Sequence, residues 1–173
     1  LELMGRNKGE YQYLHPLDHV NMSQSTNDVY PTAVKVALHF AIQRLTGAMA
    51  ELSSAFTEKA AEFADVLKMG RTQLQDAVPM TLGQEFEAFA ATLEGELTAL
   101  ERVQQSVLCE VNMGATAIGT GLNAPPGYAQ KCVDHLAAIT GFPIHLAENL
   151  IEATQNTQAF VLYSGCMKSL AIK

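Results

Sequence analysis

Residues 70–86 read GRTQLQDAVPMTLGQEF. The first half of this stretch gathers the neutral hydrogen-bonding side chains Thr72, Gln73 and Gln75 next to Arg71. The second half leads into apolar residues that recur at every third or fourth position from about residue 81 to residue 111, which is the spacing of one helix face. Because no β-hairpin signal stands out, residues 68–79 are predicted to be a loop that opens a long helix.

A second polar stretch has the same setting. Residues 23–28 read SQSTND and precede Pro31 and another apolar stripe, which runs from about residue 28 to residue 64. Asn27 or Asp28 is predicted to cap this helix, and Pro31 to lie in its first turn, where a missing N–H costs little. Two donor-rich turns at the starts of two long helices suggest a site for a small, doubly charged acid, since helix N-termini attract anions.

The remaining pattern is also helical. Leu1 to Tyr11 shows short helical periodicity, residues 114–127 form a glycine-rich connection, and two shorter helices are predicted at 128–140 and 147–173 with a break between them. At 1.5 Å per residue each long helix would measure roughly 45–55 Å, which a single small globule is too narrow to cover. The predicted fold class is therefore an all-α bundle of long helices that lie against helices of other chains.

Composition excludes several classes of function. The 173 residues carry a formal net charge of -7 with a pI of about 5.1 and no run of Lys and Arg, so nucleic acid is not expected as a partner. No stretch of about 18 or more uncharged apolar residues appears, which argues against a membrane span. Cys109, Cys132 and Cys166 have no CxxC spacing, and three free thiols predict a reducing cytoplasm.

Neither a metal nor a cofactor is predicted. His15 and His19 lie four residues apart with Asp18 between them, but Pro16 interrupts a helix there and no further ligand is in sight. A closed metal site needs three or four ligands. The GTG run at residues 119–121 lacks the preceding strand and the Lys-Ser/Thr pair of a phosphate-binding loop, so its glycines are expected to serve close backbone packing.

Three blocks of sequence carry a resemblance to a known family. They are HPLDHVNMSQSTNDVYP at residues 15–31, KMGRTQLQDAVPMTLGQEF at residues 68–86 and GATAIGTGLN at residues 114–123. Through them the chain resembles the aspartase/fumarase superfamily over essentially all of its length. The resemblance implies a homotetrameric helical core, the small dicarboxylates L-aspartate and fumarate as ligands, and the reversible elimination of ammonia from L-aspartate to give fumarate.

The resemblance also assigns roles to five residues in the two polar stretches. Ser25 and Thr26 are expected to bind the carboxylate that takes up charge, and Asn27 to hold the substrate amino group. Thr72 and Gln73 are expected to contact the substrate at the reacting centre. In the fumarase pattern His follows this threonine, whereas Gln stands here as in one aspartase subgroup, which favours an amine as the leaving group. From the residues alone, helix capping and turn formation remain alternative explanations.

Three other residues are candidates for supporting roles. Asn123 ends the third block, which the resemblance places near the active site. His15 and Asp18 match a peripheral anion site of the family, although Leu17 stands where Asn is usual.

One element of the predicted reaction is missing. In the family the base that removes the proton is a serine in a mobile Gly-Ser-Ser-x-Met-Pro-x-Lys-x-Asn loop, which occurs nowhere in these residues. The family's N-terminal threonine segment is not found either. We therefore expect residues 1–173 to be the central helical portion of such a lyase, able to assemble but not to turn over. Fumarate hydratase or another lyase of the superfamily, and a non-catalytic helical assembly module, are the alternatives.

Overall fold

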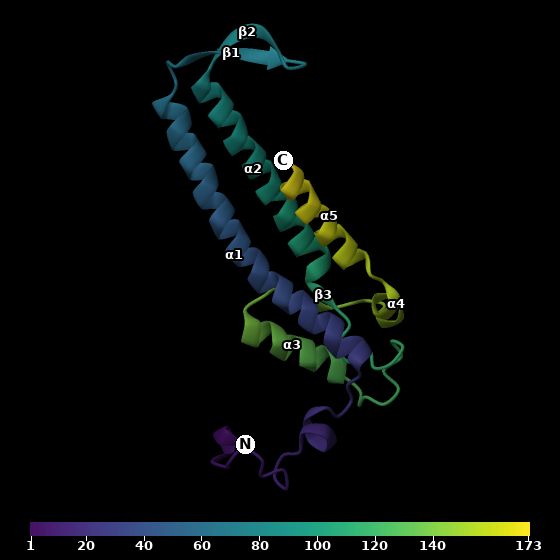
Figure 1. Ribbon diagram of the computed structural model, residues 1–173. Coiled ribbons are helices and arrows are strands. Elements are labelled where there is room, and N and C mark those ends of the chain that lie inside the picture. The colour runs from purple at the N-terminus through teal and green to yellow at the C-terminus, as the bar shows by residue number, and fades with distance from the viewer. The chain divides into compact units, whose positions relative to one another are not determined.

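The computed structural model describes residues 1–173, and these form two compact units. The first unit comprises Leu1–Ala37 and Leu108–Thr157, and the second comprises Leu38–Val107 and Gln158–Lys173. In chain order the elements are the 3₁₀ turn Glu2–Met4 (η1), the π-helical turn Pro16–Val20 (η2), α1 Thr26–Glu62, β1 Leu67–Thr72, β2 Gln75–Thr81, α2 Leu82–Val103, the π-helical turn Gln104–Leu108 (η3), β3 Glu110–Val111, α3 Tyr128–Thr140, β4 His145–Leu146, α4 Leu150–Gln155 and α5 Gln158–Ile172 (Figure 1).

The predicted helical class is confirmed, and several boundaries are corrected. The helix predicted from residue 28 to residue 64 is α1, and the helix predicted at 128–140 is α3. The helix predicted to reach residue 111 already ends at Val103, where the backbone changes to the π-helical turn η3. The last predicted helix is two helices, α4 and α5, and the predicted N-terminal periodicity yields only the short turn η1. No helix is long and apolar enough to cross a membrane.

The prediction of a loop at residues 68–79 is wrong, because this segment is an antiparallel β-hairpin. Strands β1 and β2 pair with Leu67 opposite Thr81 and Thr72 opposite Gln75. In Figure 1 the hairpin follows the end of α1 and leads directly into α2. A two-residue hairpin turn of type I′ requires φ above zero at both central residues and usually carries Asn-Gly or Asp-Gly. Here the two residues are Gln73 and Leu74, with φ of 49° and 64°, so the usual sequence signal is absent.

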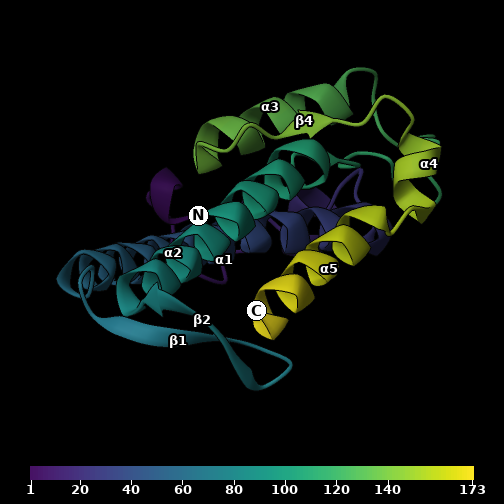
Figure 2. The same cartoon turned by 90° about the horizontal axis from the view of Figure 1, so that it is seen from above.

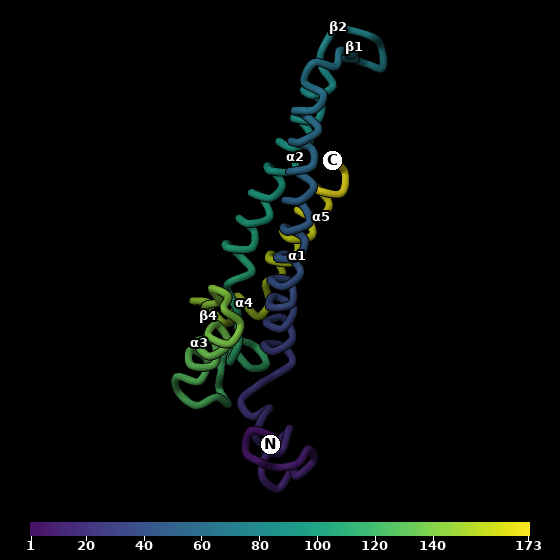
Figure 3. Tube along the Cα trace, turned by 90° about the vertical axis from the view of Figure 1, so that its left-hand side faces the viewer, coloured from purple at the N-terminus to yellow at the C-terminus, as the bar shows by residue number.

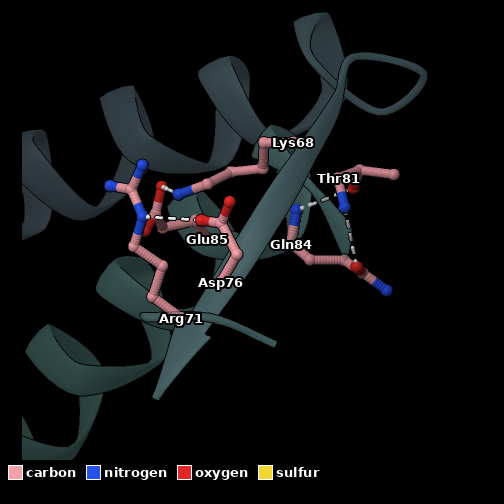
Figure 4. A network of polar contacts seen from close by, with 6 residues as sticks. All are labelled: Lys68, Arg71, Asp76, Thr81, Gln84 and Glu85. Atoms are coloured by element: carbon pink, nitrogen blue, oxygen red, sulfur yellow. Dashed lines mark hydrogen bonds and ion pairs between the residues drawn. The ribbon is translucent and has the colours of Figure 1, made fainter. Parts of the chain in front are cut away.

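The hairpin is fastened to the start of α2 by charge and by a helix cap. Lys68 of β1 pairs with Glu85 of α2 at 2.5 Å. Within the hairpin Arg71 pairs with Asp76 at 3.2 Å. Figure 4 shows both pairs. Thr81 caps α2 in a reciprocal arrangement, in which the Gln84 N–H donates to Thr81 Oγ1 at 3.1 Å and the Thr81 N–H donates to Gln84 Oε1 at 3.0 Å. These contacts satisfy orphan donors of the first helical turn and fix the hairpin's direction.

The second unit is held together by apolar and aromatic side chains. Phe56 and Phe63 of α1 meet Phe86 and Phe89 of α2, with ring centroids 5.5 to 5.9 Å apart in tilted and edge-on arrangements. Such pairs add about 0.5–1.5 kcal/mol each beyond the area they bury. Helix α5 packs along α2, as Figure 2 shows.

An alanine at Gly83 is expected to destabilise this unit. A Cβ at Gly83 would lie 2.5 Å from the carbonyl oxygen of Ala60 and 2.9 Å from the Cα of Ala64. Both neighbours are backbone atoms, so the start of α2 has to shift, and overpacking of this kind costs about 1–3 kcal/mol. Gly95→Ala is the control, because its Cβ meets nothing within 4 Å and an alanine should gain about 0.5–1 kcal/mol in the helix. The temperature of thermal unfolding should fall for Gly83→Ala and rise for Gly95→Ala. A shift of both variants in the same direction would contradict the expectation.

The first unit has its own hydrophobic core. Val111, Met113, Val133, Phe142 and Ile144 are buried together. Strands β3 and β4 pair in parallel beside this core, and α3 packs against β4, as the tube in Figure 3 shows. This core supports the segment 108–127, which returns to the start of α1 and builds the site described next.

Candidate functional site

Helix α1 begins at Thr26 and is capped by Ser25, which corrects the prediction that Asn27 or Asp28 is the cap. The Asn27 N–H donates to Ser25 Oγ at 3.2 Å, and the Ser25 N–H donates to Asp28 Oδ1 at 2.9 Å. The Ser25 side chain thus caps the N–H of Asn27, and the Asp28 side chain holds the N–H of Ser25 in turn. Because Ser25 Oγ acts as an acceptor in the cap, its hydroxyl hydrogen is still available to donate to a ligand.

Asp28 anchors the glycine-rich segment to the start of α1. Its side chain is 0% exposed, and its Oδ2 accepts from the N–H of Gly114 at 3.1 Å and of Thr116 at 2.9 Å. Together with the bond from Ser25, three backbone N–H groups converge on one buried carboxylate. The sequence pattern Ser-x-x-Asp signals a capping box, but it carries no sign of the two partners from the distant segment.

Two adjoining cavities open at this junction of α1 with residues 114–123. The first cavity has a volume of about 850 Å³ and is lined by Ser23, Ser25, Thr26, Thr116 and Asn123 among others. The second has a volume of about 670 Å³, with Asn27 in its wall, and it shares Thr26 with the first. The structure therefore brings four of the predicted site residues together, namely Ser25, Thr26, Asn27 and Asn123.

The side chain of Asn27 is oriented by the glycine-rich segment. Its Nδ2 donates to the main-chain oxygen of Ala117 at 2.6 Å. The amide oxygen Oδ1 therefore faces away from that carbonyl. An acceptor held in this way suits a ligand group that donates hydrogen bonds, such as an ammonium.

The first cavity contains hydrogen-bonding groups but no carboxylate or imidazole. Its polar side chains come from Ser, Thr, Asn, Gln and Tyr residues. Gln24, which lines the cavity, shares a hydrogen bond with the side chain of Tyr128, and burial raises the pKa of the Tyr128 hydroxyl. A tyrosine with a raised pKa remains a neutral donor at neutral pH. The cavity thus suits an anion and offers no base of its own.

Thr72 and Gln73 lie elsewhere, in the hairpin of the second unit. Both are exposed, Thr72 as the last residue of β1 and Gln73 as the first residue of the turn. The sequence shows that both side chains are polar, but it predicts a loop where they stand at the end of a hairpin strand and in its turn. We use the term hairpin tip for residues Gln73 and Leu74.

Backbone strain marks both candidate segments. Four non-glycine residues have positive φ, namely Ser23 at 63°, Gln73 at 49°, Leu74 at 64° and Thr116 at 61°. Ser23 and Thr116 line the first cavity, and the other two form the hairpin tip. Each residue in this conformation costs about 1–2 kcal/mol, and such strain clusters at functional sites. The sequence does not predict these positive φ angles, since none of the four residues is glycine.

Replacing Leu74 by glycine is expected to stabilise the chain. Leu74 is 92% exposed, so its side chain contributes almost no burial to offset the unfavourable φ. Glycine adopts this φ freely, which should gain about 0.5–1 kcal/mol after the extra entropy of the unfolded chain is subtracted. Val78→Gly is the control, because Val78 is also exposed but lies within β2, where glycine should cost about 0.5–1 kcal/mol. Urea unfolding of both variants measures the change in the free energy of unfolding, which should rise for Leu74→Gly and fall for Val78→Gly. A destabilised Leu74→Gly chain would show that the backbone at Leu74 is not strained.

His15 and Asp18 lie outside both cavities. His15 Nδ1 accepts from the N–H groups of Leu17 at 3.3 Å and Asp18 at 3.1 Å, so this histidine caps the turn η2. His19 Nδ1 in turn accepts from the His15 N–H at 2.8 Å. No group of three or more His, Cys, Asp or Glu side chains is placed to hold a metal ion. A supporting role of His15 and Asp18 stays a prediction.

Comparison with known proteins assigns the chain to a family of lyases. A family model described as "Lyase" matches residues 2–173, and the chain belongs to this family. Over its full length the chain is 58% identical to aspartate ammonia-lyase of Pseudomonas aeruginosa. It spans about 36% of the length of that relative, and a similar share of the other curated relatives.

Two solved structures extend the comparison. A fumarate lyase:delta crystallin from Brucella melitensis, bound to cobalt, is 52% identical with a TM-score of 0.93, covering 99% of this chain and 37% of the other. A class II fumarase from Schistosoma mansoni is 31% identical with a TM-score of 0.83, covering 91% of this chain and 36% of the other. These similarities confirm the resemblance drawn from the three sequence blocks.

Proposed function

We propose that the protein to which residues 1–173 belong catalyses the reversible elimination of ammonia from L-aspartate to give fumarate. The observation that carries this proposal is the cavity at the start of α1, whose polar side chains are hydroxyls and amides, with no carboxylate, imidazole or amine among them. The similarity to named aspartate ammonia-lyases supports the same choice.

The chemistry of the elimination needs such a cavity. Removal of the proton next to a carboxylate of aspartate builds a doubly charged, enolate-like species. Preorganised donors that face this developing charge supply the main stabilisation. We assign this role to the Ser25 hydroxyl, the Thr26 side chain and the N-terminus of α1. Support comes from their position at the first cavity and from the first-turn N–H groups and helix dipole, which favour negative charge.

An amine rather than a hydroxyl is the expected leaving group. Asn27 is held with its amide oxygen available as an acceptor, and an ammonium group can only donate. Gln73 is also a side chain without a useful pKa, in place of the His of the fumarase pattern. Both features favour aspartate over malate as the substrate.

Thr72 and Gln73 are proposed to reach the substrate from another copy of the chain. They follow the end of α1 in sequence, whereas Ser25 and Thr26 stand at its start. We infer a homotetramer in the cytoplasm whose sites combine segments of several copies. Residues 1–173 contribute binding groups and assembly surface but no base, and by themselves they should not turn over.

The test is fumarate formation, followed by its ultraviolet absorbance. The whole protein and the 173-residue chain are each supplied with L-aspartate and, separately, with L-malate. Fumarate from aspartate alone, made only by the whole protein, supports the proposal. Fumarate from malate would favour a fumarate hydratase, and no product from either acid would favour a non-catalytic assembly module. Turnover by the 173-residue chain would show that a base lies within it.

A further inference from the structure

Pro31 creates an unpaired carbonyl in the first turns of α1. The prediction that Pro31 lies in the first turn is wrong, because α1 begins at Thr26 and Pro31 lies inside the helix. In an α-helix the N–H of residue 31 would donate to the carbonyl of Asn27, four residues earlier. Proline has no N–H, so this carbonyl loses its helical partner.

The buried side chain of Asn112 supplies the missing donor. Asn112 is 3% exposed, and its Nδ2 donates to the main-chain oxygen of Asn27 at 3.1 Å. The same Nδ2 donates to Thr154 Oγ1 at 3.1 Å, and the Thr154 hydroxyl donates to the carbonyl of Leu150 at 2.7 Å. A chain of hydrogen bonds thus runs from α4 through Asn112 to Asn27.

Asn27 is consequently held at three of its four polar groups. Its N–H donates to Ser25 Oγ, its carbonyl accepts from Asn112, and its Nδ2 donates to Ala117. The remaining group is Oδ1, in a residue that lines the second cavity. The amide cannot rotate to exchange its donor and acceptor ends without breaking the bond to Ala117.

We propose that Asn112 and Thr154 are positioning residues that hold Asn27 as a hydrogen-bond acceptor and thereby set the preference for a substrate amine. This inference rests on the proposed function and says which residues determine the substrate specificity of the same site. A hydroxyl group both donates and accepts, so a freely rotating amide would serve it equally well. A fixed acceptor favours an ammonium, which has three donors and no acceptor.

The experiment compares an amine ligand with one that lacks the amine, in the whole protein. Asn112→Ala removes the donor to Asn27, and Thr154→Val removes its support with little change in shape. We expect kcat/KM for L-aspartate to fall about 10- to 100-fold in Asn112→Ala, because a displaced Asn27 no longer accepts from the substrate ammonium, and a hydrogen bond to a charged group is worth about this factor. The inhibition constant of succinate, which has the two carboxylates but no amine, should change less than about 3-fold, since Ser25 and Thr26 remain.

Two further variants separate positioning from folding. Thr154→Ser keeps the hydroxyl and should retain the wild-type ratio of aspartate to succinate affinity. Pro31→Ala restores an N–H that pairs with the Asn27 carbonyl, so it should recover aspartate turnover in the Asn112→Ala background. Gln130→Ala is the control for loss of an amide, because Gln130 is exposed on α3 and bonds only to Asp134.

The outcomes discriminate between the two proposals. Wild-type protein that makes no fumarate from aspartate refutes the proposed function itself. If wild type is active but Asn112→Ala weakens aspartate and succinate equally, or leaves both unchanged, Asn112 does not set the amine preference. Selective loss for aspartate, with rescue by Pro31→Ala, supports the inference.

Discussion

Replacement of Asp28 by alanine is expected to destabilise the chain by about 3–5 kcal/mol, because it removes a buried carboxylate that satisfies several backbone donors at once. The carboxylate is fully buried and receives the N–H groups of Ser25, Gly114 and Thr116. Its removal leaves these donors unpaired, and an unpaired buried donor costs about 1–3 kcal/mol. The positive φ of Thr116 also loses the contact that maintains it.

Denaturant unfolding of wild-type and variant chains measures this effect. Asp134→Ala is the control, because Asp134 is exposed on α3 and accepts only from Gln130; it should change the stability by less than about 0.5 kcal/mol. Asp28→Asn keeps the shape but turns an NH₂ group toward one of the donors, so it should also destabilise. Hydrogen exchange at Gly114 and Thr116 should accelerate in both Asp28 variants. An Asp28→Ala chain as stable as Asp134→Ala would contradict the anchoring role.

The helices were predictable because their information is local. The apolar residues of α1 recur every three or four positions, and glycines stand at both ends of α3. Such short-range signals are enough to predict a helix and its ends. The hairpin was missed for an equally local reason. Gln73 and Leu74 occupy a turn in which glycine or asparagine is usual. Neither residue has a high turn propensity, so the sequence does not predict a turn here. A strained turn is visible only in the structure.

The site was predictable only where its residues are themselves polar and clustered. Ser25, Thr26 and Asn27 stand out as a run of short donors at a helix start. Asn112 and Thr154 do not, because each acts through a partner far away in sequence. With a helix start at residue 28, the missing N–H of Pro31 would cost no hydrogen bond. Because α1 begins at Thr26, the missing N–H instead leaves the carbonyl of Asn27 without its helical partner. Roles that depend on long-range pairing require the fold.

Replacement of Ser25 by glycine is expected to lower kcat/KM for L-aspartate about 10²- to 10³-fold in the whole protein. That is the range for removing one preorganised donor from a developing oxyanion. The Ser25 hydroxyl lines the first cavity, and glycine removes it while still serving as a helix cap. Because glycine costs only a few tenths of a kcal/mol at the cap, folding should be nearly unaffected. Catalysis and capping, the two explanations open from sequence, are separated by this one change.

Steady-state kinetics and thermal unfolding on the same preparations provide the comparison. Ser54→Gly is the matched control, since Ser54 is exposed in the middle of α1, where glycine should cost about 0.5–1 kcal/mol without touching the cavity. The expected pattern is reciprocal: Ser25→Gly loses turnover and keeps its stability, whereas Ser54→Gly loses stability and keeps its turnover. A Ser25→Gly protein with wild-type kcat/KM would mean that this serine only caps α1. The donor for the developing charge would then have to come from Thr26 or from the helix N–H groups.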